Sequence, residues 1–278
     1  MKKIKIAENF YFSNNSEIKF ILGPCQIESK QHAFDICSEI KRLSNKFKFK
    51  YIYKSSFDKA NRTSHKSKRG IGIKKGLDIL SQIREKFECP VISDVHESSQ
   101  CKIAKEALDV IQIPAFLCRQ TDILLEAGRT KLPINIKKGQ FLSPWDISNV
   151  IQKIASTGNK KLLLTERGTM FGYNNLVSDM RSLEVMKETG CPVIFDATHS
   201  VQMPGGLGQA SGGQREMVPV LARAAVAVGI SGLFVECHPD PEQALSDGPN
   251  SWPLKKMESL LETLLSIDSV IKQKSLQL

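Results

Sequence analysis

The sequence repeats one pattern eight times: a short apolar run, then polar or conformationally special residues, then a segment of helical length. The apolar runs span residues 20–22, 51–53, 91–92, 110–113, 134–136, 162–164, 193–195 and 233–235. Strands that alternate with helices predict a parallel sheet. Eight such units predict an α/β fold closed into a (β/α)₈ TIM barrel. An open doubly wound sheet is the alternative, but no Gly-x-Gly-x-x-Gly follows the first run.

The segments between the runs have helical length and pattern. They cover residues 32–43, 74–87, 98–107, 121–129, 144–156, 178–189 and 214–228, and a last helix is expected over 255–271. Residues 1–18 lie outside the repeat, and their alternating Lys3-Ile4-Lys5-Ile6 predicts a hairpin that caps the amino-terminal end of the barrel. With 278 residues and 41% hydrophobic content, we expect one domain over 1–278.

Composition narrows the class of protein. No run approaches the ~20 apolar residues of a membrane span. Glu8 and Asn9 stand where a signal peptide needs an apolar stretch. Seven Cys without close pairing favour free thiols in a reducing compartment, so a cytoplasmic protein is expected.

The formal net charge of +10 raises the possibility of nucleic-acid binding. The 39 cations are nevertheless spread along the chain, with no basic arm, zinc-finger spacing or array of stacking aromatics. A lysine-rich surface that attracts anionic substrates is the favoured interpretation, and nucleic acid is the minor alternative.

In a TIM barrel, the residues that follow the strands meet at one mouth, where active sites lie. Six cations follow the predicted strands: Lys54, Lys59, Arg62, Arg119, Lys137 and Arg167. Each cation, taken alone, is explained equally well as part of a surface ion pair. Together they favour two anionic substrates, or one substrate with both phosphate and carboxylate, because clustered like charges are costly without anions.

A second group at the same mouth combines a thiol, an imidazole and two carboxylates: Cys25, His199, Glu236 and Asp247. This donor set suits a borderline divalent ion such as Zn²⁺, Fe²⁺ or Mn²⁺. No short metal motif links the four residues, so a buried thiol and ordinary polar side chains are the alternative. The glycine-rich stretch 203–213 predicts a mobile loop over the substrate, or a plain surface loop.

Several long motifs together resemble the 3-deoxy-D-manno-octulosonate 8-phosphate synthase family. They are the runs 54–64, 94–97, 112–122, 135–138, 167–176, 195–199, 236–241 and 246–249. The resemblance implies the condensation of phosphoenolpyruvate with D-arabinose 5-phosphate and water, with release of inorganic phosphate, in lipopolysaccharide core biosynthesis. It also implies a homotetramer.

The resemblance carries roles to individual positions. It implies that phosphoenolpyruvate is held by Lys54, Ser56, Lys59, Lys137 and Arg167. The arabinose phosphate would meet Asn61, Arg62 and Thr63, of which the last two reach a neighbouring subunit's site in this family. Asp94, Gln112 and His199 would line the space between. Catalytic roles fall to Lys59, Lys137, His199 and Asp247.

The family has a metal-independent branch, with Asn where this chain has Cys25, and a metal-dependent branch, with Cys. The resemblance therefore implies a metal held by Cys25, His199, Glu236 and Asp247. The sister 3-deoxy-D-arabino-heptulosonate 7-phosphate synthase, which uses erythrose 4-phosphate, is the alternative enzyme. It carries Lys-Pro-Arg-Thr where this chain has Ala60-Asn61 before Arg62-Thr63. A non-catalytic phosphate- or nucleic-acid-binding barrel is the alternative from another class.

Overall fold

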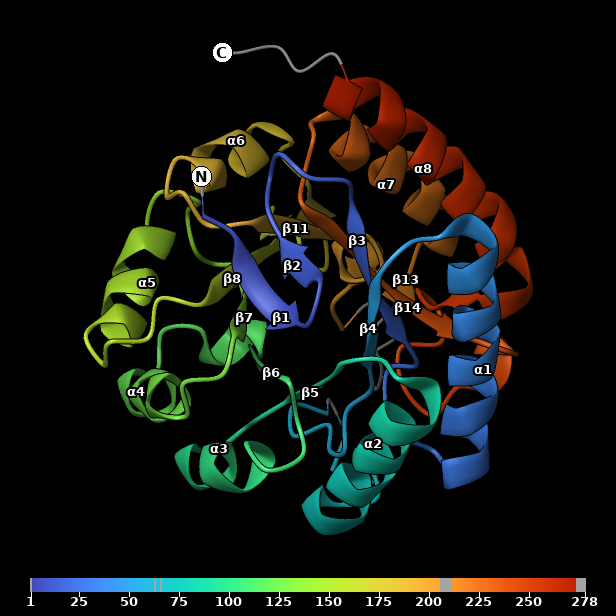
Figure 1. Cartoon of the computed structure of the whole chain (residues 1–278), viewed down its shortest axis with the longest axis horizontal. Helices are drawn as coiled ribbons and strands as arrows, with labels where there is room; N and C mark the ends of the chain where they lie inside the picture. The colour runs from blue at the N-terminus through green and yellow to red at the C-terminus, as the bar shows by residue number, and fades with distance from the viewer. Residues whose placement is uncertain (1, 63, 66, 206–211, 274–278) are drawn as a thin grey trace.

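Eight parallel strands close into a ring in the computed structural model, which describes residues 2–62, 64–65, 67–205 and 212–273. They are β3 (Lys19–Gly23), β4 (Tyr51–Lys54), β5 (Val91–Asp94), β6 (Val110–Ile113), β7 (Ile134–Lys137), β8 (Leu162–Glu166), β11 (Val193–Asp196) and β14 (Gly232–His238). Each strand pairs in parallel with the next, and the pairing of β11 with β14 closes the barrel (Figure 1). The predicted TIM barrel is confirmed, and the open sheet is wrong.

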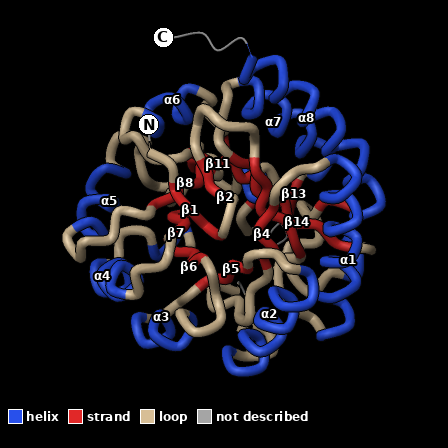
Figure 2. Tube along the Cα trace, in the orientation of Figure 1, coloured by secondary structure: helices blue, strands red, loops and turns tan. Residues whose placement is uncertain are grey.

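In the described ranges, eight helices surround the strands (Figure 2). They are α1 (Lys30–Phe47), α2 (Ile73–Phe87), α3 (Ser98–Ala104), α4 (Thr121–Arg129), α5 (Ile147–Ala155), α6 (Arg181–Lys187), α7 (Val218–Ala227) and α8 (Met257–Gln273). Several are shorter than predicted, because tighter turns with i→i+3 hydrogen bonds replace the α-helix at their ends, such as Ala107 N to Ala104 O after α3.

Short elements fill the connections. The strands are β9 (Thr169–Met170), β10 (Leu176–Val177), β12 (Gln202–Met203), β13 (Gly212–Gly213) and β15 (Trp252–Pro253). The 3₁₀ turns are η1 (Ala115–Leu117), η2 (His199–Val201), η3 (Arg215–Met217), η4 (Pro241–Gln243) and η5 (Leu254–Lys256). Most of them lie in the loops that follow the carboxyl ends of the barrel strands.

Apolar side chains form two packed regions on either side of the strands. In β3, Phe20 and Leu22 belong to the region between strands and helices, whereas Ile21 belongs to the barrel interior. Side chains of successive strand residues point to opposite faces, which explains this division. The barrel is therefore a filled core, and chemistry is confined to its end.

The predicted hairpin closes the amino-terminal end of the barrel. It consists of β1 (Ile4–Ala7) and β2 (Phe10–Phe12), paired antiparallel. Phe12 is fully buried in the interior cluster, and a Cβ atom added to Gly232 at the start of β14 would lie 2.6 Å from its ring. Glycine at position 232 therefore leaves room for the aromatic plug.

We expect Phe12→Ala to lower the free energy of unfolding by about 3–5 kcal/mol, because it leaves a cavity that the barrel wall cannot fill. Tyr11→Ala, in the same strand but with an exposed side chain, is the matched control and should change it by much less. Urea unfolding of both variants measures the difference. Equal losses would show that Phe12 does not plug the barrel.

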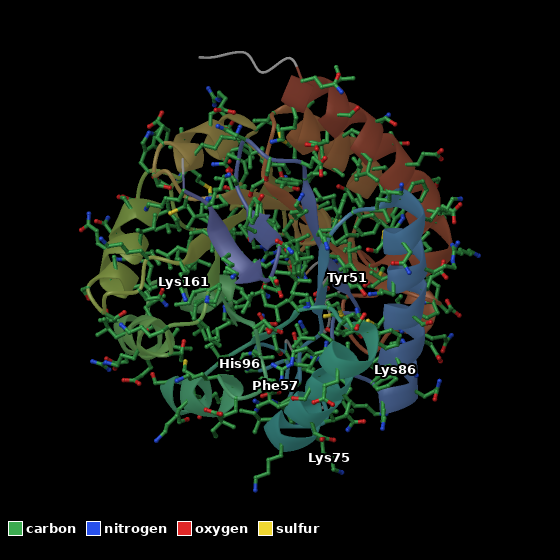
Figure 3. All side chains as sticks on the ribbon, viewed as in Figure 1. Tyr51, Phe57, Lys75, Lys86, His96 and Lys161 are labelled. Atoms are coloured by element: carbon green, nitrogen blue, oxygen red, sulfur yellow. The ribbon has the colours of Figure 1, made fainter. Side chains whose placement is uncertain are left out.

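The lysines that give the chain its positive charge are distributed around the outside. Lys75 and Lys86 on α2 are exposed, and so is Lys161 before β8, on another part of the molecule (Figure 3). Within the described ranges, no helix combines the length and apolar character that crossing a membrane requires.

Candidate active site

A cavity of about 650 Å³ opens at the carboxyl ends of the barrel strands. Ten of the predicted site residues line it: Lys54, Lys59, Asn61, Arg62, Asp94, Gln112, Lys137, Arg167, His199 and Asp247. Its size is that of a site for small molecules. The barrel thus brings together residues that lie far apart in the sequence.

Other predicted residues lie elsewhere. Ser56, Cys25 and Glu236 are buried directly behind the lining and contact it. Arg119 is exposed and does not line the cavity of this chain, contrary to the prediction. Thr63 lies outside the described residues, as does most of the predicted closing loop, at 206–211.

Close packing sets the position of the loop after β4. A Cβ atom on Gly23 would lie 2.0 Å from the carbonyl oxygen of Lys54, so only glycine allows β3 and β4 to approach this closely. Phe57 is buried between Gly76 of α2 and the ring of His96, whose centroid is 5.9 Å away (Figure 3). This anchor holds the backbone that presents Lys54 and Lys59.

Carboxylates offset two of the lysines. Lys54 Nζ lies 2.7 Å from Glu236 Oε1, and both Lys54 and Lys59 lie 3.8 Å from Asp94 Oδ2. Burial alone would raise the pKa of Asp94, but these two ammonium groups hold it well below its ordinary range. The chain's own carboxylates therefore neutralise part of the cation cluster, which bound anions alone were expected to do.

Lys137 is another buried cation of the cavity. Its Nζ donates a hydrogen bond to Asp196 and lies 3.2 Å from the ring centroid of Phe234. Burial lowers the pKa of Lys137 to about 8, although Asp196 opposes the shift. An amine that titrates near neutral pH is suited to hold and release a proton.

Arg167 is the buried cation without a carboxylate partner among the described residues. One of its terminal nitrogens donates to the carbonyl of His199 at 3.1 Å and to Gln202 Oε1 at 2.8 Å. Its Nε is buried without a hydrogen-bond partner in the described part of the chain. Such a group favours binding of an anion in the cavity.

Arg62 faces the cavity from the loop after β4 but is bound to this chain's own oxygens. Its guanidinium donates to the carbonyl oxygens of Lys68 and Leu245, to Ser246 Oγ at 2.8 Å and to Gln26 Oε1 at 3.0 Å. A phosphate at Arg62 would therefore replace or share some of these bonds.

Three of the four predicted metal ligands form one compact group. Ligand atoms of Cys25, Glu236 and Asp247 all lie within 4.8 Å of one another. His199 Nε2 is 3.6 Å from the carboxylates of both Glu236 and Asp247. Asp247 also adopts a φ of +51°, which is uncommon for a residue other than glycine and typical of functional positions.

The protonation and hydrogen bonding of these side chains also favour a bound cation. His199 Nδ1 lies 2.7 Å from Asp196 Oδ2, which places a proton on Nδ1 and turns Nε2 toward the carboxylates. Burial opposes the charged ring, but Asp196 and Glu236 raise the pKa of His199, so a metal would replace a proton at Nε2. Glu236 Oε2 is buried without a hydrogen-bond partner in the described chain. Burial, followed by Asp247 and Glu236, raises the pKa of the Cys25 thiol. Sulfur, nitrogen and oxygen donors of this kind fit Zn²⁺, Fe²⁺ or Mn²⁺.

Sequence reasoning gave no role to Asp196, although this carboxylate joins Lys137 to His199. Its position three residues before a histidine, at the end of an apolar run, is a signal that could have identified it. A buried chain of hydrogen bonds was also missed, in which Thr165 donates to Asn135, Asn135 to Gln112, and Gln112 to Asp94. It fixes which atom of the Gln112 amide faces Asp94.

Comparison with known proteins agrees with this geometry. A family model described as the DAHP synthetase I family matches residues 2–273. A Rhodopseudomonas palustris protein named 2-dehydro-3-deoxyphosphooctonate aldolase is 56% identical over 271 residues, which cover 97% of this chain and 94% of the relative. Proteins of the same name from Alkalilimnicola ehrlichii and Granulibacter bethesdensis are 58% and 56% identical over 252 and 266 residues. These alignments cover 91% and 96% of this chain, and 91% and 94% of the relatives.

Proposed function

Because the chain belongs to the DAHP synthetase I family, we propose that it condenses phosphoenolpyruvate with D-arabinose 5-phosphate and water. The products are 3-deoxy-D-manno-octulosonate 8-phosphate and inorganic phosphate. The observation that carries the proposal is one cavity that combines strand-end cations with a sulfur, nitrogen and oxygen donor set. The shared name of the relatives favours this reaction over that of the erythrose 4-phosphate enzyme.

Phosphoenolpyruvate binds, in this proposal, against Lys54, Lys59, Lys137 and Arg167. The unpaired Nε of Arg167 supports the assignment, because a buried guanidinium gains most from an anion. Ser56 is proposed to act through Asp94, since its hydroxyl donates to that carboxylate. Its role is to orient that carboxylate.

Arabinose 5-phosphate binds near Asn61 and Arg62 at the rim, and its aldehyde lies toward Asp94, Gln112 and His199. The exposed position of Asn61 and the location of Arg62 beside the 245–249 loop support a phosphate site at the entrance. Thr63 is proposed to join this site. The two anions would then occupy different parts of the one cavity.

A divalent metal would be held by Cys25, His199, Glu236 and Asp247. When bound it would supply positive charge that orients the aldehyde and the attacking water. Burial first, and then the neighbouring carboxylates, raise the pKa of the Cys25 thiol. Metal binding must therefore displace the thiol proton, and affinity rises with pH.

The chain's own residues contribute mainly by position and charge. The C3 carbon of phosphoenolpyruvate forms a bond to the aldehyde carbon, water adds to C2, and the bond between C2 and the phosphate oxygen breaks. Holding two anions in fixed sites makes this encounter effectively intramolecular. Lys137 holds a proton near the developing alkoxide, and Asp196 orients both Lys137 and His199.

Phosphate release with each aldose in turn tests the proposed function. We expect turnover with arabinose 5-phosphate and little with erythrose 4-phosphate, because the Ala60-Asn61 insertion shapes the rim for the longer sugar. Each assay also contains phosphoenolpyruvate, and a reaction without aldose is the control. Turnover of erythrose 4-phosphate alone would assign the sister activity instead. Salt-sensitive DNA binding without turnover would favour a binding protein.

The wider setting is proposed on the same basis. The product would serve lipopolysaccharide core biosynthesis, and the enzyme would act as a homotetramer. Seven cysteines, none of them in a disulfide, suit the reducing cytoplasm.

A further inference from the structure

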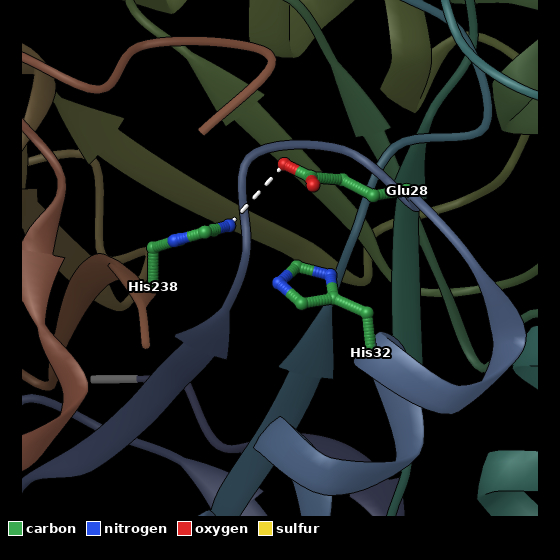
Figure 4. Close-up of side chains that lie close together, drawn as sticks. All are labelled: Glu28, His32 and His238. Carbon is green, nitrogen blue, oxygen red and sulfur yellow. Dashed lines mark ion pairs between the residues drawn. The ribbon is translucent and has the colours of Figure 1, made fainter. Parts of the chain in front are cut away.

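Glu28, His32 and His238 gather just outside the cavity lining, from the loop after β3, the first turn of α1 and the end of β14 (Figure 4). Their possible ligand atoms all lie within 4.8 Å of one another. His238 Nε2 is 3.3 Å from Glu28 Oε1, and the ring centroids of the two histidines are 4.7 Å apart. The group therefore has a composition that suits a metal or a hydrogen-bonded support.

The proton on His238 argues against a metal. His238 Nδ1 accepts the backbone N–H of Asp240 at 3.1 Å, so the neutral ring carries its proton on Nε2, the atom that faces Glu28. His199 has the opposite arrangement, because its Nδ1 contacts Asp196 and that hydrogen bond remains when Nε2 gives up its proton. A metal at His238 Nε2 would have to displace the proton on that nitrogen. In the neutral ring that proton cannot move to Nδ1, because Nδ1 already accepts the N–H of Asp240.

Glu28 and His238 contact the same loop at two points. Glu28 Oε1 accepts the backbone N–H of Leu245 at 3.0 Å, and His238 Nδ1 accepts that of Asp240. The same carboxylate oxygen lies 3.3 Å from His238 Nε2, which is buried without a hydrogen-bond partner among the described residues, so Glu28 contacts both the histidine ring and Leu245. The packing of His32 on the His238 ring restricts rotation of that ring.

The residues that follow Leu245 belong to the proposed site. Ser246 Oγ accepts a hydrogen bond from Arg62, and Asp247 accepts one from the Cys25 thiol at 3.1 Å. Asp247 holds an uncommon backbone conformation, which surrounding contacts must maintain. The position of the Leu245 amide thus affects where both side chains point.

We propose that Glu28 and His238 are positioning residues, which clamp the loop 239–249 so that Ser246 and Asp247 face the cavity. The proposal rests on the proposed function, because it assigns Asp247 and Arg62 to the reaction. Glu28 acts through the acceptor capacity of one oxygen and not through its charge. Neither residue lines the cavity.

Three substitutions of Glu28 separate geometry from charge. Glu28→Gln keeps an oxygen that can accept from the Leu245 N–H and lie beside His238, but removes the charge. Glu28→Asp keeps the charge but is too short to reach both partners, and Glu28→Met keeps the length without an acceptor. Steady-state kinetics with each substrate, bound metal per chain and the thermal midpoint are measured for all three.

We expect Glu28→Gln to resemble the wild type and the Asp and Met variants to lose about 10- to 100-fold in kcat/KM for the aldose phosphate. The KM for phosphoenolpyruvate should stay unchanged, because Lys54, Lys137 and Arg167 do not lie on the clamped loop. If Glu28→Met does not fold, the contrast between Gln and Asp carries the test.

Three results would overturn the clamp. They are a Gln variant as impaired as the Asp and Met variants, a Met variant equal to the wild type, and a second zinc equivalent per chain that is lost in Glu28→Gln. The last would make the group a metal site. A wild type that turns over neither aldose would instead refute the proposed function, so the two failures can be distinguished.

Discussion

Lys137→Met is expected to lower kcat/KM by about 1,000-fold, the range that loss of a positioned proton donor and an anion partner produces. Lys137 is buried and contacts Asp196, and burial lowers its pKa to about 8, so most molecules carry the ammonium form at neutral pH. Steady-state phosphate release measures the loss. Lys161→Met removes an exposed lysine and is the matched control.

The pH dependence of Lys137 provides an independent readout. The folded-state pKa is lowered, so the ammonium loses its proton as the pH rises through about 8. If the ammonium is the active form, kcat/KM of the wild type falls above that pH. Lys137→Arg cannot lose its proton in this range and should lack this decline. A decline of equal size in the Arg variant would assign it to another group.

We expect activity to fall when the metal is removed. The loss should exceed the decrease of about 10- to 100-fold that is typical when a residue hydrogen-bonded to a metal ligand is substituted. Cys25→Ala should retain less metal than the wild type, because the thiolate is the soft donor of the set. Metal content is measured by elemental analysis, and activity before and after addition of Zn²⁺, Fe²⁺ or Mn²⁺. Cys101→Ala removes a buried thiol on α3 and is the control.

Cys25→Asn decides how the metal contributes. An Asn variant that keeps activity in chelator, when Cys25→Ala does not, would indicate that the site mainly positions substrate and water. Loss of activity in both would indicate that the metal takes part in the chemistry. A wild type whose activity is unchanged after complete metal removal would contradict the proposed site itself.

Local sequence patterns were sufficient to predict the barrel. Each strand is a short apolar run flanked by polar residues, and each helix has an apolar face, so both signals lie within a few residues of one another. Eight repeats then implied closure, and closure placed Lys54, Lys137 and Arg167 at one mouth. The hairpin was also predictable, because its alternation is local.

Long motifs identified more of the site residues than the spacing between residues could. Cys25 and Asp247 are 222 positions apart, and no spacing rule links them. Resemblance to a family supplied their association, and the barrel places the two side chains in contact. Arg119 shows the limit of the strand-end rule, because a residue beyond the first turn of the loop need not face the mouth.

The strand-helix pattern by itself was thus enough to establish the architecture and the end of the barrel where chemistry occurs. It could not establish which charges pair, which nitrogen of a histidine carries the proton, or which oxygen holds the 239–249 loop. Two groups form only when the barrel closes. They are Asp196 with Lys137 and His199, and Glu28 with His238 and Leu245. Such contacts depend on distances of a few ångströms between distant segments, and those distances are set by packing of the whole barrel.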